Sequence, residues 1–201
     1  YIFKLKSINY FLSILNHIFR RLYNKLIMDK DTTKINIEEV MKFYGYAGTS
    51  GNISLKAKLS KSWILHYLAY ISPFSNFIIS MQRLRGVKIG EKCHFSSYVL
   101  LDLIYPQIIT IGNNVTISHN VMIFTHANPT ANLFLKKKYP RKVESVIIKD
   151  GAVINPGSII IAGVTIGKDA IVSVGSVVTE DVPDRTIVVG NPARPIKKIE
   201  D

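Results

Sequence analysis

Cysteine is almost missing from this sequence of 201 residues, and acidic side chains are scarce in its first part. The single cysteine, Cys93, excludes an intrachain disulfide and any metal site built from several thiolates, and it fits a reducing compartment. Residues 1–86 hold 13 of the 26 Lys and Arg but only 4 of the 14 Asp and Glu, so most of the net charge of +12 lies there. This basic segment indicates an anionic partner, such as a membrane surface or nucleic acid, or simply a solvated face.

Charge is also absent from residues 62–82, which form a stretch long enough to span a membrane. Pro73, Asn76, His66 and four serines interrupt it, so we interpret it as two short amphipathic helices that separate at the sequence SPFSN. Upstream, apolar residues at helical spacing predict an amphipathic helix over residues 8–26. A short helix is expected in INIEEVMKFYGY, followed by a turn at GTSGN.

The rest of the sequence repeats with a period of six. Between residues 147 and 183 an aliphatic residue stands at every sixth position, and a small or β-branched residue follows four positions later. Helices and single strands do not give this period, whereas a parallel β-helix does, with three hexapeptides in each triangular coil. The aliphatic positions are Ile148, Ile154, Ile160, Ile166, Val172 and Val178, and the followers are Ala152, Ser158, Val164, Ala170, Ser176 and Val182.

The same pattern continues upstream with two interruptions, which makes twelve hexapeptides, or four coils. The second interruption leaves an inserted loop near residues 128–146. We therefore expect a mainly β protein, with a parallel β-helix over residues 87–201 and a helical region over residues 1–86. The upstream aliphatic positions are Ile89, Phe95, Leu101, Ile111, Ile117 and Ile123, with Cys93, Val99, Tyr105, Val115, Val121 and Ala127 as followers.

The stretches IGNNVTISHNVMIFTHAN and GVTIGKDAIVSVGSVVTEDVPDRTIVVGNPARPIKKI, with the inserted loop between them, resemble the hexapeptide-repeat acyltransferases. The similarity is with their sugar O-acetyltransferase branch, which includes maltose, galactoside and polysaccharide-modifying enzymes, and it covers about residues 85–199. It implies a left-handed β-helix, a homotrimer with active sites between neighbouring coils, acetyl-CoA as acyl donor, and no required metal.

His126, in FTHAN, lies where the chain leaves the repeat for the inserted loop, a place where function concentrates. Acyl transfer from a thioester to a hydroxyl needs a base, and imidazole suits this at neutral pH. A lone His is often structural, but the resemblance implies that His126 is the catalytic base. Asp102 falls in the third hexapeptide of the preceding coil, so both residues are expected on one face. Asp102 could orient His126, bind a sugar hydroxyl or make local backbone hydrogen bonds.

The resemblance also implies a coenzyme site along the coils, where small residues allow close approach to the backbone. One departure from the family is Val153, which stands where a Trp is frequent and removes a stacking contact. The basic sequence FLKKKYPRK in the inserted loop either closes over an anionic acceptor or a neighbouring site, or forms a solvated hairpin tip. The expected coenzyme-binding residues are Asn155, Ala162, Gly163, Val174, Gly175 and Thr179, with Arg194 and Lys197 for the phosphates.

The leading interpretation is an acetyl-CoA-dependent O-acetyltransferase that modifies a sugar of a bacterial surface polysaccharide or its precursor. A serine acetyltransferase-like enzyme and a catalytically silent scaffold stay as alternatives, although the acidic, His-containing acceptor motifs of the former are missing. The γ-type carbonic anhydrases share the expected fold, but His94 and His119 fall on other faces, so no zinc site is expected. We expect no nucleic-acid partner, and a cytoplasmic location with peripheral contact between the N-terminal region and the inner membrane face.

Overall fold

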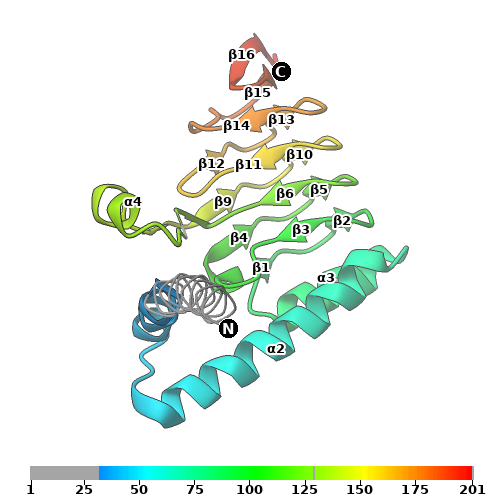
Figure 1. Ribbon diagram of the computed structural model, residues 1–201. Helices are drawn as coiled ribbons and strands as arrows, with labels where there is room; N and C mark the ends of the chain where they lie inside the picture. The colour runs from blue at the N-terminus through cyan, green and yellow to red at the C-terminus, as the bar shows by residue number, and fades with distance from the viewer. Residues whose placement is uncertain (1–31, 129, 201) are drawn as a thin grey trace, which may run out of the picture.

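The computed structural model describes residues 32–128 and 130–200, and most of them form a prism of stacked triangular coils (Figure 1). Twelve short strands make four coils, as the period of six predicts. The first two coils contain β1 (Lys88–Ile89), β2 (His94–Phe95), β3 (Leu100–Leu101), β4 (Ile109–Ile111), β5 (Thr116–Ile117) and β6 (Met122–Ile123). The last two contain β9 (Val146–Ile148), β10 (Val153–Ile154), β11 (Ile159–Ile160), β12 (Thr165–Ile166), β13 (Ile171–Val172) and β14 (Val177–Val178).

The coils stack into three parallel sheets, one for each side of the prism. The first sheet has the strand order β1-β4-β9-β12 and the third has the order β3-β6-β11-β14. The second contains β2-β5-β10-β13 and continues into β15 (Thr186–Gly190) and β16 (Ala193–Lys198), which pair antiparallel at the far end of the prism. The prediction of a parallel β-helix is therefore confirmed.

The inward positions of the repeat form the core. Ile117 stacks in register on Ile154, and Ile154 on Val172, so successive coils place similar side chains on one another. All twelve predicted positions are buried, eleven of them with at most 2% of their surface exposed, as Ile111 and Ile148 are. Burying each such side chain contributes about 1.5–3 kcal/mol, so the repeat is the main source of stability.

Tight corners join the strands. At Gly167 a Cβ atom would lie 2.4 Å from the backbone nitrogen of Asp184, which only glycine avoids. Asn114 and Asn120 take positive φ values of 55° and 58°, a region that asparagine tolerates better than most residues. The polar and glycine positions between the aliphatic ones therefore define where the chain turns.

The insertion leaves the prism after β6. It begins with β7 (His126–Ala127), continues through α4 (Leu133–Lys138) and returns through β8 (Lys142–Val143), which pairs antiparallel with β7. The interpretation of its basic sequence as a solvated hairpin tip is wrong in one respect. Lys136 is only 8% exposed, because its Nζ lies 2.9 Å from a carboxylate oxygen of Glu39, which belongs to the helix of residues 32–43.

Helices cover the base of the prism (Figure 1). Residues 32–43 are helical, as expected, and α2 (Gly48–Ile71) and α3 (Ser75–Leu84) follow. The predicted break at SPFSN is confirmed, but α2 is long rather than short, and the predicted turn at GTSGN is wrong. Gly51 donates its N–H to the carbonyl of Ala47 at 3.1 Å and packs against Tyr46, so it serves close packing within the first turn of α2.

The helical layer shares the hydrophobic core of the prism. Ala69 and Ile78 belong to the same buried cluster as Phe95, and Leu55 packs in a second cluster with Tyr105. Within residues 32–128 and 130–200, every helix is too short or too polar to cross a bilayer. The helix expected over residues 8–26 lies outside the described residues.

Candidate active site

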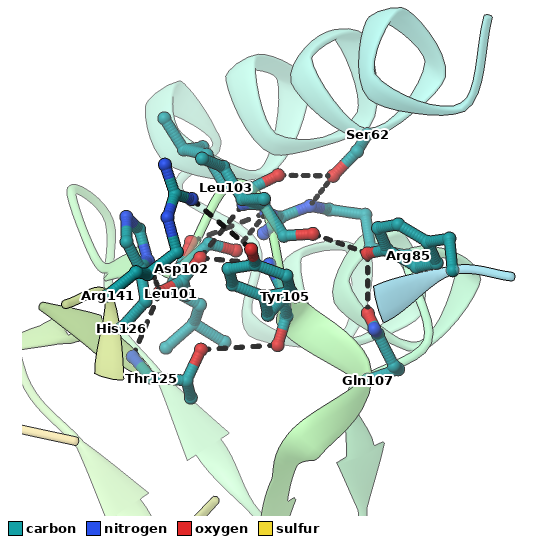
Figure 2. Close-up of polar contacts among 12 residues, drawn as sticks. Ser62, Arg85, Leu101, Asp102, Leu103, Tyr105, Gln107, Thr125, His126 and Arg141 are labelled. Atoms are coloured by element: carbon teal, nitrogen blue, oxygen red, sulfur yellow. Dashed lines mark hydrogen bonds and ion pairs between the residues drawn. The ribbon is translucent and has the colours of Figure 1, made fainter. Parts of the chain in front are cut away.

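The strands of the third sheet begin at one corner of the prism and end at another, and we call these two corners the edges of the sheet. Asp102 follows β3 and is buried at the edge where the strands end, with 1% of its surface exposed. Its Oδ1 accepts hydrogen bonds from the backbone N–H groups of Ile104 at 2.8 Å and Tyr105 at 3.0 Å. Its Oδ2 accepts the N–H of Thr125 at 2.9 Å (Figure 2). These bonds fix the carboxylate where the chain turns between the first two coils.

His126 completes the coordination of this carboxylate from the next coil. Its Nδ1 lies 2.6 Å from Oδ2 of Asp102, and its side chain is 14% exposed. The backbone of β7 pairs with β8 opposite Val143, and the ring meets that of Tyr105 edge to face at 5.4 Å. Asp102 therefore makes the local backbone hydrogen bonds expected at a corner and also contacts His126, and because it is buried its oxygens are not open to a sugar hydroxyl.

The protonation of this pair follows from its surroundings. Burial opposes ionisation of Asp102, but the hydrogen bonds from His126 and from the N–H groups of Tyr105 and Thr125 outweigh it. Together they hold the pKa of the Asp102 carboxyl well below its usual range. An ionised carboxylate only accepts hydrogen bonds, so Nδ1 of His126 is the donor, and an imidazole with a single proton on Nδ1 has its lone pair on Nε2. Among the described residues, none bonds to Nε2.

Arg85, which the sequence did not single out, holds the backbone on the other side of Asp102. Its Nη2 donates to the carbonyl of Asp102 at 2.6 Å, and its Nε donates to Oγ of Ser62 on α2 at 3.1 Å (Figure 2). Its Nη1 contacts Gln82 at 2.5 Å and Nδ1 of His66 at 3.1 Å. Burial lowers the pKa of Arg85 to about 10, and burial together with the Arg85 charge lowers the pKa of His66 to about 4.

A cavity of about 390 Å³ lies beside His126, between the helix of residues 32–43 and the insertion. Tyr105 and Val143, which both contact or pair with His126, belong to its wall. Arg141 donates to the Tyr105 hydroxyl at 3.2 Å, and burial raises the pKa of that hydroxyl. The other residues that line the cavity are Glu39, Lys42, Phe43, Pro140 and Arg141.

Some of these residues left a signal in the sequence. Tyr105 occupies a follower position, and nearly all of the remaining hexapeptides have a small or β-branched residue there. The large side chain of Tyr105 is therefore an exception within the repeat. Glu39 and Arg141 left none, because their ion pair at 3.1 Å joins segments about a hundred residues apart. Long-range pairing of this kind is set by the packing of the helix against the insertion.

Comparison with known proteins finds acetyltransferases among the similar chains. The Bacillus subtilis protein YvoF, described as an acetyltransferase, is 34% identical over 145 residues, which cover 72% of this chain and 80% of YvoF. The galactoside O-acetyltransferase of Lactococcus lactis is 32% identical over 116 residues, or 56% of each chain. The structure of a maltose O-acetyltransferase from Clostridium difficile superposes with a TM-score of 0.59 at 27% identity, over 73% of this chain and 89% of that one. No family model matches.

The chain belongs to the hexapeptide-repeat acetyltransferases. In this acetyltransferase, the predicted coenzyme-binding residues of the coils separate into two groups. Ala162, Gly163 and Thr179 follow β11 and β14, at the same edge of the third sheet as Asp102 and His126. The structure does not bring the remaining group to this edge, because Asn155, Val174 and Gly175 follow β10 and β13 at the opposite edge of that sheet.

The basic residues predicted for the coenzyme phosphates lie on β16. Arg194 is exposed and lies 3.4 Å from a carboxylate oxygen of Glu180, so a ligand at this position would compete with an exposed ion pair. Lys197 is exposed on the same strand. His94 and His119 are also exposed, and within the described residues no three His, Cys, Asp or Glu side chains gather as they would around a metal ion.

Proposed function

We propose that this protein is an O-acetyltransferase that moves the acetyl group of acetyl-CoA to a sugar hydroxyl. The observation that carries the proposal is the bond between His126 and a buried, ionised Asp102, next to a cavity. Burying a carboxylate is costly unless its partners compensate, and here three of the four partners are rigid backbone N–H groups. A catalytically silent scaffold would have no need of such a pair.

His126 acts as the base in this mechanism. Its Nε2 takes the proton of the acceptor hydroxyl while the hydroxyl oxygen attacks the thioester carbonyl carbon. The C–S bond then breaks, and the proton on Nε2 passes to the departing thiolate, which gives an acetyl ester and free coenzyme A. Asp102 keeps the proton on Nδ1 and stabilises the positive charge of the ring between these two transfers.

A second copy of the chain would complete the donor site. Gly163 lies at the edge of the third sheet that holds His126, whereas Gly175 lies at the opposite edge. Packing of these two edges from neighbouring subunits would line one groove with both groups, and three such contacts close a trimer. We therefore propose a homotrimer of left-handed β-helices, with acetyl-CoA held between subunits and its phosphates near Arg194 and Lys197.

The cavity beside His126 is our proposed acceptor site. Phe43, which is 42% exposed, offers aromatic surface for the apolar face of a sugar ring, and Glu39 and Lys42 offer polar groups for its hydroxyls, while the buried side chains of Tyr105 and Arg141 support the wall behind them. Of the acceptors that such a cavity fits, we propose a sugar of a bacterial surface polysaccharide or its precursor. Because the precursors of such polymers are made inside the cell, we place the enzyme in the cytoplasm.

The test is the release of free thiol from acetyl-CoA by the purified full chain against a panel of free, nucleotide-activated and lipid-linked sugars. His126→Ala should lower the turnover number about 10²–10⁴-fold with little change in acetyl-CoA affinity. His94→Ala is the matched control, because it removes an exposed imidazole from β2, on a flat side of the prism and not at either corner that lines the proposed groove. Arg194→Ala should instead raise the KM for acetyl-CoA.

Two results would overturn parts of this proposal. Turnover of the His126→Ala variant within a few-fold of wild type would exclude His126 as the base. Absence of thiol release with every sugar, from a folded protein, would favour the silent scaffold.

A further inference from the structure

The outer face of α2 is apolar, which is unusual for a helix on a protein surface. Buried positions such as Leu55 and His66 face the prism, while the positions on the opposite side carry large apolar side chains. These side chains follow helical spacing and continue past Ile71 onto the start of α3. The members are Ile53, Trp63, Ile64, Tyr67, Leu68, Ile71, Phe74 and Phe77, each between 40% and 72% exposed. We call this set the α2 outer face.

The charged side chains of α2 and α3 themselves all have one sign. Residues 40–90 contain seven Lys and Arg and no Asp or Glu. Lys56 and Lys61 are exposed and lie on either side of the stripe formed by Ile53, Ile64 and Ile71, as a helix of 3.6 residues per turn requires. An apolar stripe that contains aromatic side chains and is bordered by lysines is the arrangement that lets a helix lie in the interface of a membrane.

We propose that the α2 outer face docks on the surface of a membrane that contains anionic lipids. The apolar side chains would enter the boundary between headgroups and acyl chains, and the lysines would meet lipid phosphates. A second copy of the chain that packed through the same face would set Lys56 and Lys61 against like charges, because residues 40–90 contain no Asp or Glu, whereas an anionic bilayer offers phosphates to both. The charge of the surface therefore selects a lipid partner over a second copy of this chain.

Docking through this face would bring the active site close to the bilayer. Ser62, on the buried side of α2, donates to the carbonyl of Leu103 at 3.2 Å, one residue after Asp102 (Figure 2). A helix with its side chains is about 10–12 Å across, so the loop that holds Asp102 would stand about one helix diameter above the headgroups. This consequence, which rests on the proposed function, selects an acceptor sugar attached to a lipid.

The experiment is co-sedimentation of the full chain with vesicles of phosphatidylcholine, with and without phosphatidylglycerol, at low and high salt. Wild-type protein should bind only the vesicles with phosphatidylglycerol, and salt should weaken the binding. Lys56→Gln should weaken binding about five-fold, the factor that corresponds to about 1 kcal/mol per engaged cation. Ile64→Asp should weaken it at least about ten-fold.

Ile196→Asp is the matched control for Ile64→Asp. Both side chains are exposed isoleucines, at 64% and 63%, but Ile196 lies on β16 at the end of the prism far from α2 (Figure 1). The control should bind like wild type. Thiol release with a water-soluble sugar acceptor should be unchanged in Ile64→Asp, so failure of docking is separated from failure of catalysis.

Three outcomes would overturn the docking proposal. Wild-type protein that binds no vesicle would exclude it, and so would Ile64→Asp and Ile196→Asp variants with equal binding. A lower molecular mass of Ile64→Asp in sedimentation velocity without vesicles would show that the α2 outer face is a contact between subunits.

Discussion

The substitution Asp102→Asn replaces one carboxylate oxygen by an NH2 group. It tests two roles of the carboxylate: the orientation of His126 and the hydrogen bond to the buried N–H of Thr125. The four groups around it all donate: N–H groups of Ile104, Tyr105 and Thr125, and Nδ1 of His126. The Asn oxygen can keep the first two bonds, which leaves the amide NH2 group facing Thr125 and His126. The NH2 group can bond to His126 only if Nδ1 accepts, and the proton of the neutral ring then moves to Nε2.

This rearrangement predicts two effects of different size. With a proton on Nε2, His126 cannot accept the proton of the hydroxyl, so the turnover number should fall about 10²–10⁴-fold. The N–H of Thr125, which is 0% exposed, loses its acceptor, so the free energy of unfolding should fall by about 1–3 kcal/mol. The two readouts are steady-state thiol release from acetyl-CoA and urea unfolding followed by circular dichroism.

Asp150→Asn is the control for Asp102→Asn. Asp150 also accepts a backbone N–H bond at a corner of the prism, from Asn113 at 2.7 Å, but it is exposed and contacts no His. Its turnover number should equal that of wild type. If Asp102→Asn also retains turnover within a few-fold, the proton on Nδ1 of His126 does not control catalysis, and the reasoning from the hydrogen-bond pattern fails.

Three further predictions concern the helical layer and the core. Arg85→Met should lower the turnover number with little change in the KM for acetyl-CoA. Arg85→Lys should retain part of the turnover number, because the lysine can still donate to the carbonyl of Asp102. Equal loss of turnover in both variants would contradict this reasoning. In the folded protein the pKa of His66 is lowered to about 4, whereas in the unfolded chain it has its ordinary value of about 6.5. As the pH falls below about 6.5, His66 therefore takes up a proton in the unfolded chain but not in the folded protein. The free energy of unfolding should therefore drop by about 2 kcal/mol between pH 7 and 5 through this site, and urea unfolding of His66→Gln should lack that part of the drop. Ile154→Ala should destabilise the prism by about 2–5 kcal/mol in the same assay, and a smaller loss would mean that neighbouring coils close the cavity.

The sequence alone determined the prism. Its repeat places an aliphatic side chain such as Ile117 or Ile154 at every sixth position, and each coil finds its register by stacking like residues on like. The information is local, because a hexapeptide specifies its own strand and corner whatever lies elsewhere in the chain. For the same reason the sequence placed Asp102 and His126 on one face, since both follow the third strand of a coil.

The tertiary structure decided what the helices do and how the site is held. GTSGN has the composition of a turn, yet it opens α2, because Gly51 allows close packing against Tyr46. Neither the ion pair between Lys136 and Glu39 nor the bonds of Arg85 to the loop of Asp102 follow from any short motif. These contacts join segments from different elements, and their energy depends on burial and on distances of about 3 Å, which exist only once the helices have packed on the prism.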